Sequence, residues 1–183
     1  MKNGDLLHNP WTDSHEDLVR LFKLNDKPAT NGEPRFARVE FNPDDTRTAD
    51  KIDFYKLTID ESRTPAWFDD AMKKSVTDKL RLIVSEMIIK GDADLPCGGA
   101  YILAKGAKIS CVKNARILVM CESSTVGEMW ESSKVGEMRG SSNVGVMWGS
   151  SNVGVMCESS KVGEMWGASN VEKDNRIVKN PVK

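Results

Sequence analysis

The chain has 183 residues, of which 39% are hydrophobic and 29% charged, a composition typical of a folded, soluble protein rather than a disordered one. Its net charge of −1 does not indicate binding to nucleic acid. No apolar run approaches the roughly 20 residues of a membrane helix, and the N-terminus lacks the apolar stretch of a secretory signal. We therefore expect a cytoplasmic protein with reduced cysteines and no membrane partner.

The first ninety residues predict a small α+β domain. Ser14 is placed to cap a helix in which Leu18, Leu21 and Phe22 follow at helical spacing. The stretch 27–34 contains Pro, Asn and Gly and is expected to be a loop.

Two strands and a longer helix complete this predicted domain. Residues 35–41 alternate, with Ala37, Val39 and Phe41 inward, and residues 52–59 form a second strand with Tyr55, Leu57 and Ile59 inward. Thr64-Pro65 starts a helix that Gly91 ends, with apolar side chains at helical spacing along it. These elements place the first domain at residues 1–95.

A nine-residue repeat fills most of the remaining chain. Its copies are Ser123-Ser-Thr-Val-Gly-Glu-Met-Trp-Glu131, SSKVGEMRG, SSNVGVMWG, SSNVGVMCE and SSKVGEMWG, with a degenerate copy at 115–120. Valine recurs at Val126, Val135, Val144, Val153 and Val162, and methionine at Met129, Met138, Met147, Met156 and Met165. Glycine in every copy disfavours a helix. The unit instead predicts two short strands joined at a glycine corner, stacked as a β-solenoid over residues 96–171 with inward Val and Met columns.

Two units are expected to form one turn, because the contour of nine residues, about 30 Å, barely encloses two faces about 10 Å apart. The residue after each methionine supports an 18-residue turn. Alternate copies give Trp130, Trp148 and Trp166 on one edge and Cys121, Arg139 and Cys157 on the other. Cys121 and Cys157 would lie about 10 Å apart, too far for a disulfide. The tryptophans either cover the coil or contact a partner, and both interpretations stay open.

The combination of Thr58-Ile-Asp-Glu-Ser-Arg-Thr-Pro-Ala-Trp-Phe68 with C-terminal SSxVGxM copies resembles a group of uncharacterised bacteriophage and prophage proteins. The repeat also resembles pentapeptide-repeat proteins in being a short-period repeat that stacks as a β-solenoid, although its period is nine residues. The phage resemblance covers most of the chain from about residue 50. It implies a phage origin and action in the cytoplasm of an infected bacterium, and it implies no activity.

The motifs of enzymes and cofactor sites are missing from the sequence. Only His8 and His15 are present, whereas acyltransferases built on similar coils use a histidine placed by the coil. His15-Glu16-Asp17 is interpreted as the solvated first turn of a helix, and Cys97-Gly-Gly99 as a structural turn. No zinc, calcium-repeat, phosphate-loop or dinucleotide motif occurs. We therefore predict no catalytic residue, metal or cofactor.

Three functions remain from the sequence. The first is a protein-binding or scaffolding solenoid that docks a partner on its flat face or tryptophan edge and inhibits or sequesters a host factor such as a defence enzyme. The second is self-association through a solenoid end or edge, with residues 172–183 as a tail or cap. The third is mimicry of DNA, which the sequence disfavours: residues 121–167 carry six Glu against three basic residues, far below the charge density of a duplex.

Overall fold

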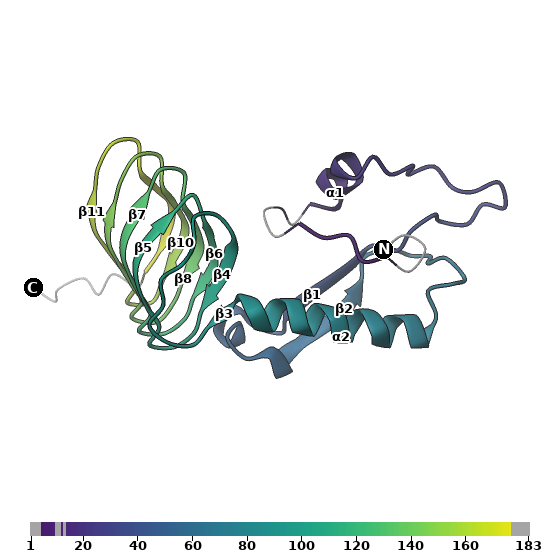
Figure 1. The fold of residues 1–183 in the computed structure, drawn as a ribbon, viewed down its shortest axis with the longest axis horizontal. Coiled ribbons are helices and arrows are strands. Elements are labelled where there is room, and N and C mark those ends of the chain that lie inside the picture. Colours follow the sequence, from purple (N-terminus) through teal and green to yellow (C-terminus); the bar gives the residue numbers. More distant parts are fainter. Residues whose placement is uncertain (1–4, 10–11, 13, 177–183) are drawn as a thin grey trace, which may run out of the picture. The chain divides into compact units, whose positions relative to one another are not determined.

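The computed structural model describes residues 5–9, 12 and 14–176 of the chain. These residues form two compact units (Figure 1). The first contains the described residues of Met1–Asp44 and Lys51–Ser85, and the second those of Asp45–Asp50 and Glu86–Lys183. The division differs from the predicted one, because a short segment from the N-terminal part belongs to the solenoid unit.

The first unit contains a short helix and a β-hairpin. Helix α1 (His15–Leu21) begins as predicted at Ser14, whose hydroxyl accepts a hydrogen bond from the Asp17 amide. Strands β1 (Val39–Pro43) and β2 (Tyr55–Ile59) pair antiparallel. The residues before β2 form a 3₁₀ turn rather than strand. Ile59 is exposed, contrary to the prediction, because the strand ends there and leaves its last side chain uncovered.

The long helix is shorter than predicted at both ends. Helix α2 spans Asp70–Met87, and Asp69 accepts a hydrogen bond from the Met72 amide at its start. Phe68 and Val76 are buried together with Ala37 in the core of the first unit. At the other end Ile88–Ile89 leave the helix and form strand β3, a conformation that suits β-branched side chains.

The second unit is a β-solenoid of about five turns with about 18 residues per turn, spanning residues 88–175. Both sheets are parallel, and paired residues in successive turns of the repeat lie 18 positions apart, as between Val135, Val153 and Val171. One sheet has the order β12-β10-β8-β6-β4-β3 and the other the order β11-β9-β7-β5. The strands after β3 are β4 (Ala100–Leu103), β5 (Lys108–Lys113), β6 (Arg116–Met120), β7 (Thr125–Trp130), β8 (Lys134–Met138), β9 (Asn143–Met147), β10 (Asn152–Cys157), β11 (Lys161–Met165) and β12 (Asn170–Asn175).

These bounds confirm the solenoid and its 18-residue turn and extend it at both ends of the predicted range. Strand β3 begins it before residue 96, and β12 continues it through residues 172–175, which the sequence analysis assigned to a tail. The rest of that predicted cap, 177–183, lies outside the described residues.

The repeat unit bends rather than running straight. Val126 and Met129 are both fully buried although they are three residues apart, whereas a straight strand alternates its faces every second residue. The same spacing recurs along the coil, so that the valines and methionines fill the interior. The second serine of each pair is also fully buried, and the hydroxyls of Ser124, Ser133 and Ser151 donate to the carbonyl three residues earlier at 2.6–2.7 Å. These serines close the corners between the two sheets.

Candidate functional site

The structure brings Trp130, Trp148 and Trp166 together in one ladder, called the Trp edge below. Each follows or ends a strand of the four-stranded sheet, and consecutive turns place them one above another. The ring centroids of Trp130 and Trp148 are 5.2 Å apart, and those of Trp148 and Trp166 are 5.8 Å apart. The planes diverge by only 17° and 15°, so the indoles are stacked.

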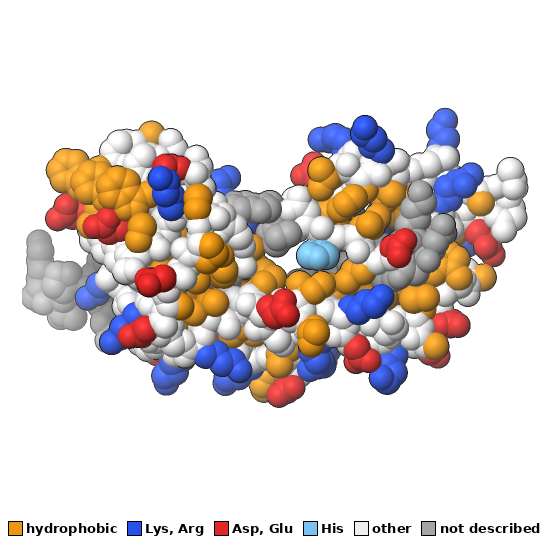
Figure 2. Space-filling model, viewed as in Figure 1, with side chains coloured by type: hydrophobic (Ala, Val, Ile, Leu, Met, Phe, Trp, Pro, Cys, Tyr) orange, Lys and Arg blue, Asp and Glu red, His pale blue; other side chains and the backbone are white. Residues whose placement is uncertain are grey.

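The Trp edge is an exposed apolar surface. Trp130 is 38% exposed, Trp166 is 51% exposed, and Trp148 between them is half-buried. Figure 2 shows a row of adjoining hydrophobic side chains on the solenoid with acidic side chains beside it. Contiguous exposed aromatic surface of this kind is uncommon except where another molecule binds.

Acidic residues two positions earlier in the repeat accompany the outer tryptophans. The Nε1–H of Trp130 donates to Glu128 at 2.7 Å, and that of Trp166 donates to Glu164 at 3.0 Å. The equivalent position below Trp148 is Val146, which offers no acceptor. The buried Nε1–H of Trp148 consequently has no hydrogen-bond partner among the described residues.

The opposite edge has a different chemistry. Cys121, Arg139 and Cys157 follow or end strands of the six-stranded sheet, as an 18-residue turn requires. The Arg139 guanidinium lies 2.7 Å from Glu137, and the Cys157 thiol donates to the same carboxylate at 3.5 Å. All four cysteines are free thiols.

Residues Asp45–Asp50, called the covering segment below, belong to the same unit, and their carboxylates lie near this Cys/Arg edge: Asp50 is close to Cys121, and Asp45 is close to Arg139. The Asp50 carboxylate accepts a hydrogen bond from the Lys105 amide at 3.3 Å, and Ala49 is buried. Within the segment, the Arg47 guanidinium lies 2.5 Å from Asp45 and holds the pKa of that carboxyl at about 2. This contact could not be predicted from the sequence, because nothing in the composition of residues 45–50 marks them as part of a solenoid.

Burial against the covering segment changes the chemistry of Cys121. Desolvation, with a further contribution from the Asp50 carboxylate, raises the pKa of the Cys121 thiol to about 12. Burial also raises the pKa of Cys157, and the hydrogen bond to Glu137 adds to the effect. Neither thiol is activated as a nucleophile at neutral pH.

The predicted core columns of valine and methionine are buried in the first four full copies of the repeat and are exposed to solvent in the last copy. The valines from Val126 to Val153 and the methionines from Met129 to Met156 are buried, whereas Val162 is partly exposed and Met165 is 43% exposed. Strand β11 is the terminal strand of its sheet, so no further described strand covers it. In β12 the methionine position is taken by Asp174, which pairs with Arg176.

The remaining sequence candidates lie elsewhere in the fold. Gly98 and Gly99 adopt positive φ, and the Gly98 amide donates to the Lys113 carbonyl at 3.0 Å, which makes the segment after Cys97 a turn. His15 is largely buried rather than solvated: its Nδ1 lies 3.0 Å from Asp60, a residue 45 positions away that the sequence analysis did not connect with it.

No family model, curated protein or solved structure shows significant similarity to this chain. Among the described residues, no helix combines the length and the apolar character needed to cross a bilayer.

Proposed function

We propose that this protein is a non-enzymatic binding solenoid whose Trp edge docks a partner protein. The observation that carries the proposal is the contrast between the two edges. On the Cys/Arg edge, residues 45–50 of the same chain lie near Cys121, which is buried, whereas on the Trp edge the outer two of three stacked indoles are exposed. Tryptophan is one of the residues enriched among those that dominate the binding energy of interfaces.

The chemistry around the ladder favours a partner surface with an apolar centre and a basic rim. Glu128 and Glu164 flank the outer indoles, and residues 121–167 together carry a net charge of −3. Arginine and lysine side chains on the partner would pair with these carboxylates and lie near the indole rings. Charge at the rim would speed association, and burial of the indoles would slow dissociation.

The proposed partner is a host protein, and the proposed effect is its inhibition or sequestration. This part rests on the resemblance of the Thr58–Phe68 segment and the SSxVGxM copies to bacteriophage proteins. A rigid coil with one exposed edge suits sequestration, since binding requires no ordering of the solenoid.

Comparative capture tests the role of the Trp edge. Tagged wild-type protein and a Trp130→Ala/Trp166→Ala variant are used as baits in the same host lysate, and bound proteins are quantified by mass spectrometry. Phe54→Ala is the matched control, because Phe54 is also an exposed aromatic residue but lies in the first unit. We expect a protein that wild type and the Phe54 variant retain equally and that the double variant loses at least tenfold. Equal retention by all three baits would refute the proposal that the partner binds on the Trp edge.

A second candidate function is self-association through the end of the coil. The exposed Met165 and Trp166 on the terminal strand β11 favour it, because an uncovered strand edge can pair with another chain. Light scattering distinguishes the candidates. A dimer that Trp166→Ala dissociates supports self-association, whereas a monomer at micromolar concentration excludes it and leaves the edge free for another protein.

A further inference from the structure

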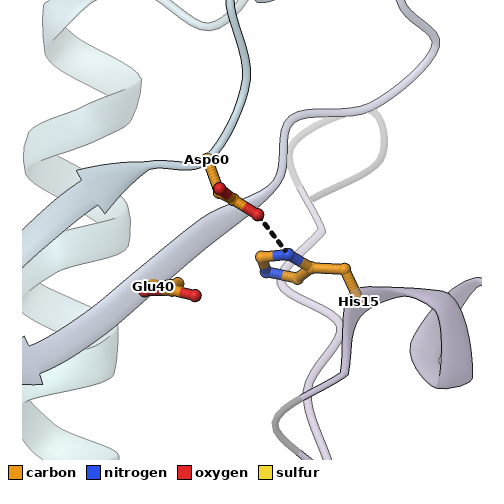
Figure 3. A group of neighbouring side chains, drawn as sticks. All are labelled: His15, Glu40 and Asp60. Atoms are coloured by element: carbon orange, nitrogen blue, oxygen red, sulfur yellow. Dashed lines mark hydrogen bonds and ion pairs between the residues drawn. The ribbon is translucent and has the colours of Figure 1, made fainter.

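Three side chains from separate parts of the first unit converge on one point. His15 is the first residue of α1, Glu40 lies on β1, and Asp60 directly follows β2. One ligand atom from each lies within 4.8 Å of the others. Figure 3 shows the imidazole facing both carboxylates, with the hairpin bringing Glu40 and Asp60 to the same side of His15.

The hydrogen bonds of His15 leave a place for a cation. Its Nε2 lies 3.3 Å from the Val39 carbonyl oxygen, and its Nδ1 lies 3.0 Å from Oδ2 of Asp60. Both neighbours are acceptors, but a neutral imidazole has only one N–H to donate. In the tautomer whose Nε2–H donates to Val39, the lone pair of Nδ1 faces the Asp60 carboxylate, and a cation bound by both atoms would stabilise that arrangement. A backbone carbonyl on the second ring nitrogen is also the usual support of a metal-bound histidine.

The charges around the cluster also favour a bound cation. Glu40 and Asp60 supply two carboxylates, and no described Lys or Arg forms an ion pair with either. Among the described residues, the Glu40 side chain accepts a hydrogen bond from the Asn42 side-chain amide, which is a neutral donor. One proton on His15 would balance one carboxylate, whereas a divalent cation balances both.

We propose that His15, Glu40 and Asp60 bind a divalent metal ion of the zinc class. One imidazole nitrogen and two carboxylate oxygens are established zinc ligands, and three protein ligands leave the fourth tetrahedral position for water. Ligand atoms on zinc lie about 3.4 Å apart, given bonds of about 2.1 Å. The exposed Glu40 side chain closes the present spacing by rotating about its own bonds.

The bound metal holds α1 against the β-hairpin. This helix has only seven residues and none of them is fully buried, so its length and packing hold it only weakly. A metal bound at His15 ties its first residue to both strands of the hairpin. Binding to the folded state alone then stabilises the first unit in proportion to the logarithm of the metal concentration.

Titration of the full chain with Zn²⁺ and Co²⁺ tests the proposal. We expect one Zn²⁺ per chain by calorimetry, a higher melting temperature with metal, and a Co²⁺ spectrum without the intense thiolate-to-metal bands. Glu40→Gln is the decisive variant, because it keeps the size of an exposed side chain and leaves the His15–Asp60 contact in place. It should weaken Zn²⁺ binding at least about tenfold.

Asp17→Asn is the matched control, since Asp17 is an exposed carboxylate on α1 outside the cluster, and it should bind Zn²⁺ as wild type does. His15→Asn should abolish binding. The proposal is overturned if wild type binds no Zn²⁺, if Glu40→Gln binds it unchanged, or if replacing the exposed Cys97 and Cys111 by serine removes the binding instead.

Discussion

Glycine in each repeat is required by the close approach of successive turns. A Cβ on Gly145 would lie 2.5 Å from the Gly127 carbonyl oxygen, and Gly163 stands in the same relation to Gly145 at 2.4 Å. These oxygens belong to strand backbone, which cannot move aside without disturbing the ladder. The glycine of the repeat is therefore a packing requirement inside a single strand, and the prediction that it forms a corner between two short strands is wrong.

We expect Gly145→Ala to lower the free energy of unfolding by about 1–3 kcal/mol, because the added methyl group overpacks the stack. Urea denaturation followed by circular dichroism measures the change. Gly91→Ala is the control, since no atom lies within 4 Å of its added Cβ. A Gly145 variant as stable as the control would show that the turns are not so closely stacked.

The unpartnered indole of Trp148 gives a second prediction at this scale. Val146→Gln supplies a neutral acceptor where the outer copies have Glu128 and Glu164, and it should stabilise the coil by about 0.5–1.5 kcal/mol. Glutamate at position 146 would stabilise the coil less than glutamine, because Val146 pairs with Glu128 and Glu164 on the neighbouring strands and a third carboxylate would repel both. Val155→Gln, on the other sheet, is the control for the substitution itself. Denaturation midpoints rank the variants, and equal effects at 146 and 155 would contradict the role of the indole.

The pKa of Cys121 predicts its reactivity. A thiol with a pKa of about 12 is about one part in ten thousand thiolate at pH 8, and raising the pH to 9 still leaves it protonated. We therefore expect iodoacetamide to modify the exposed Cys97 while Cys121 stays unmodified at both pH values, as read by mass spectrometry of peptides. Modification of Cys121 at the rate of Cys97 would show that the covering segment leaves this edge open.

At the scale of the elements, the alternation of Trp with Cys and Arg predicted the two edges, because residues 18 apart share a face of the coil. Other features had no local signal. Residues 88–89 continue the helical spacing of α2, yet pairing with β4 makes them a strand. Contacts between distant segments, such as Asp50 with Lys105 or His15 with Asp60, depend on the fold as a whole and leave no periodicity in the sequence.

The stacked ladder should be visible in circular dichroism. Indoles with centroids 5.2 and 5.8 Å apart couple their electronic transitions. Because the twist of the sheet rotates each ring relative to the next, the coupling produces a paired positive and negative band in the far ultraviolet. Trp148→Ala should remove that pair of bands, since it separates Trp130 from Trp166, and should also destabilise the coil by about 1–3 kcal/mol. Replacement of Trp67, which packs in the first unit, should leave the bands in place.

At the scale of the whole molecule, the end of the coil is asymmetric. Strand β11 leaves Met165 exposed, whereas β12 places Asp174 at the position that methionine occupies in the turns before it. A charged residue in the core column opposes continuation of that sheet into another chain. The sequence shows this change of residue, but only the strand register reveals that it falls in the core column.

Photo-crosslinking tests most directly whether a partner protein binds on the Trp edge. A benzoylphenylalanine residue replaces either Glu164, beside Trp166, or Lys134, exposed on the six-stranded sheet, and each protein is irradiated in host lysate. We predict that position 164 gives a covalent adduct with the same protein that wild type captures, and that position 134 gives none. An adduct from position 134 with none from position 164 would contradict binding on the Trp edge.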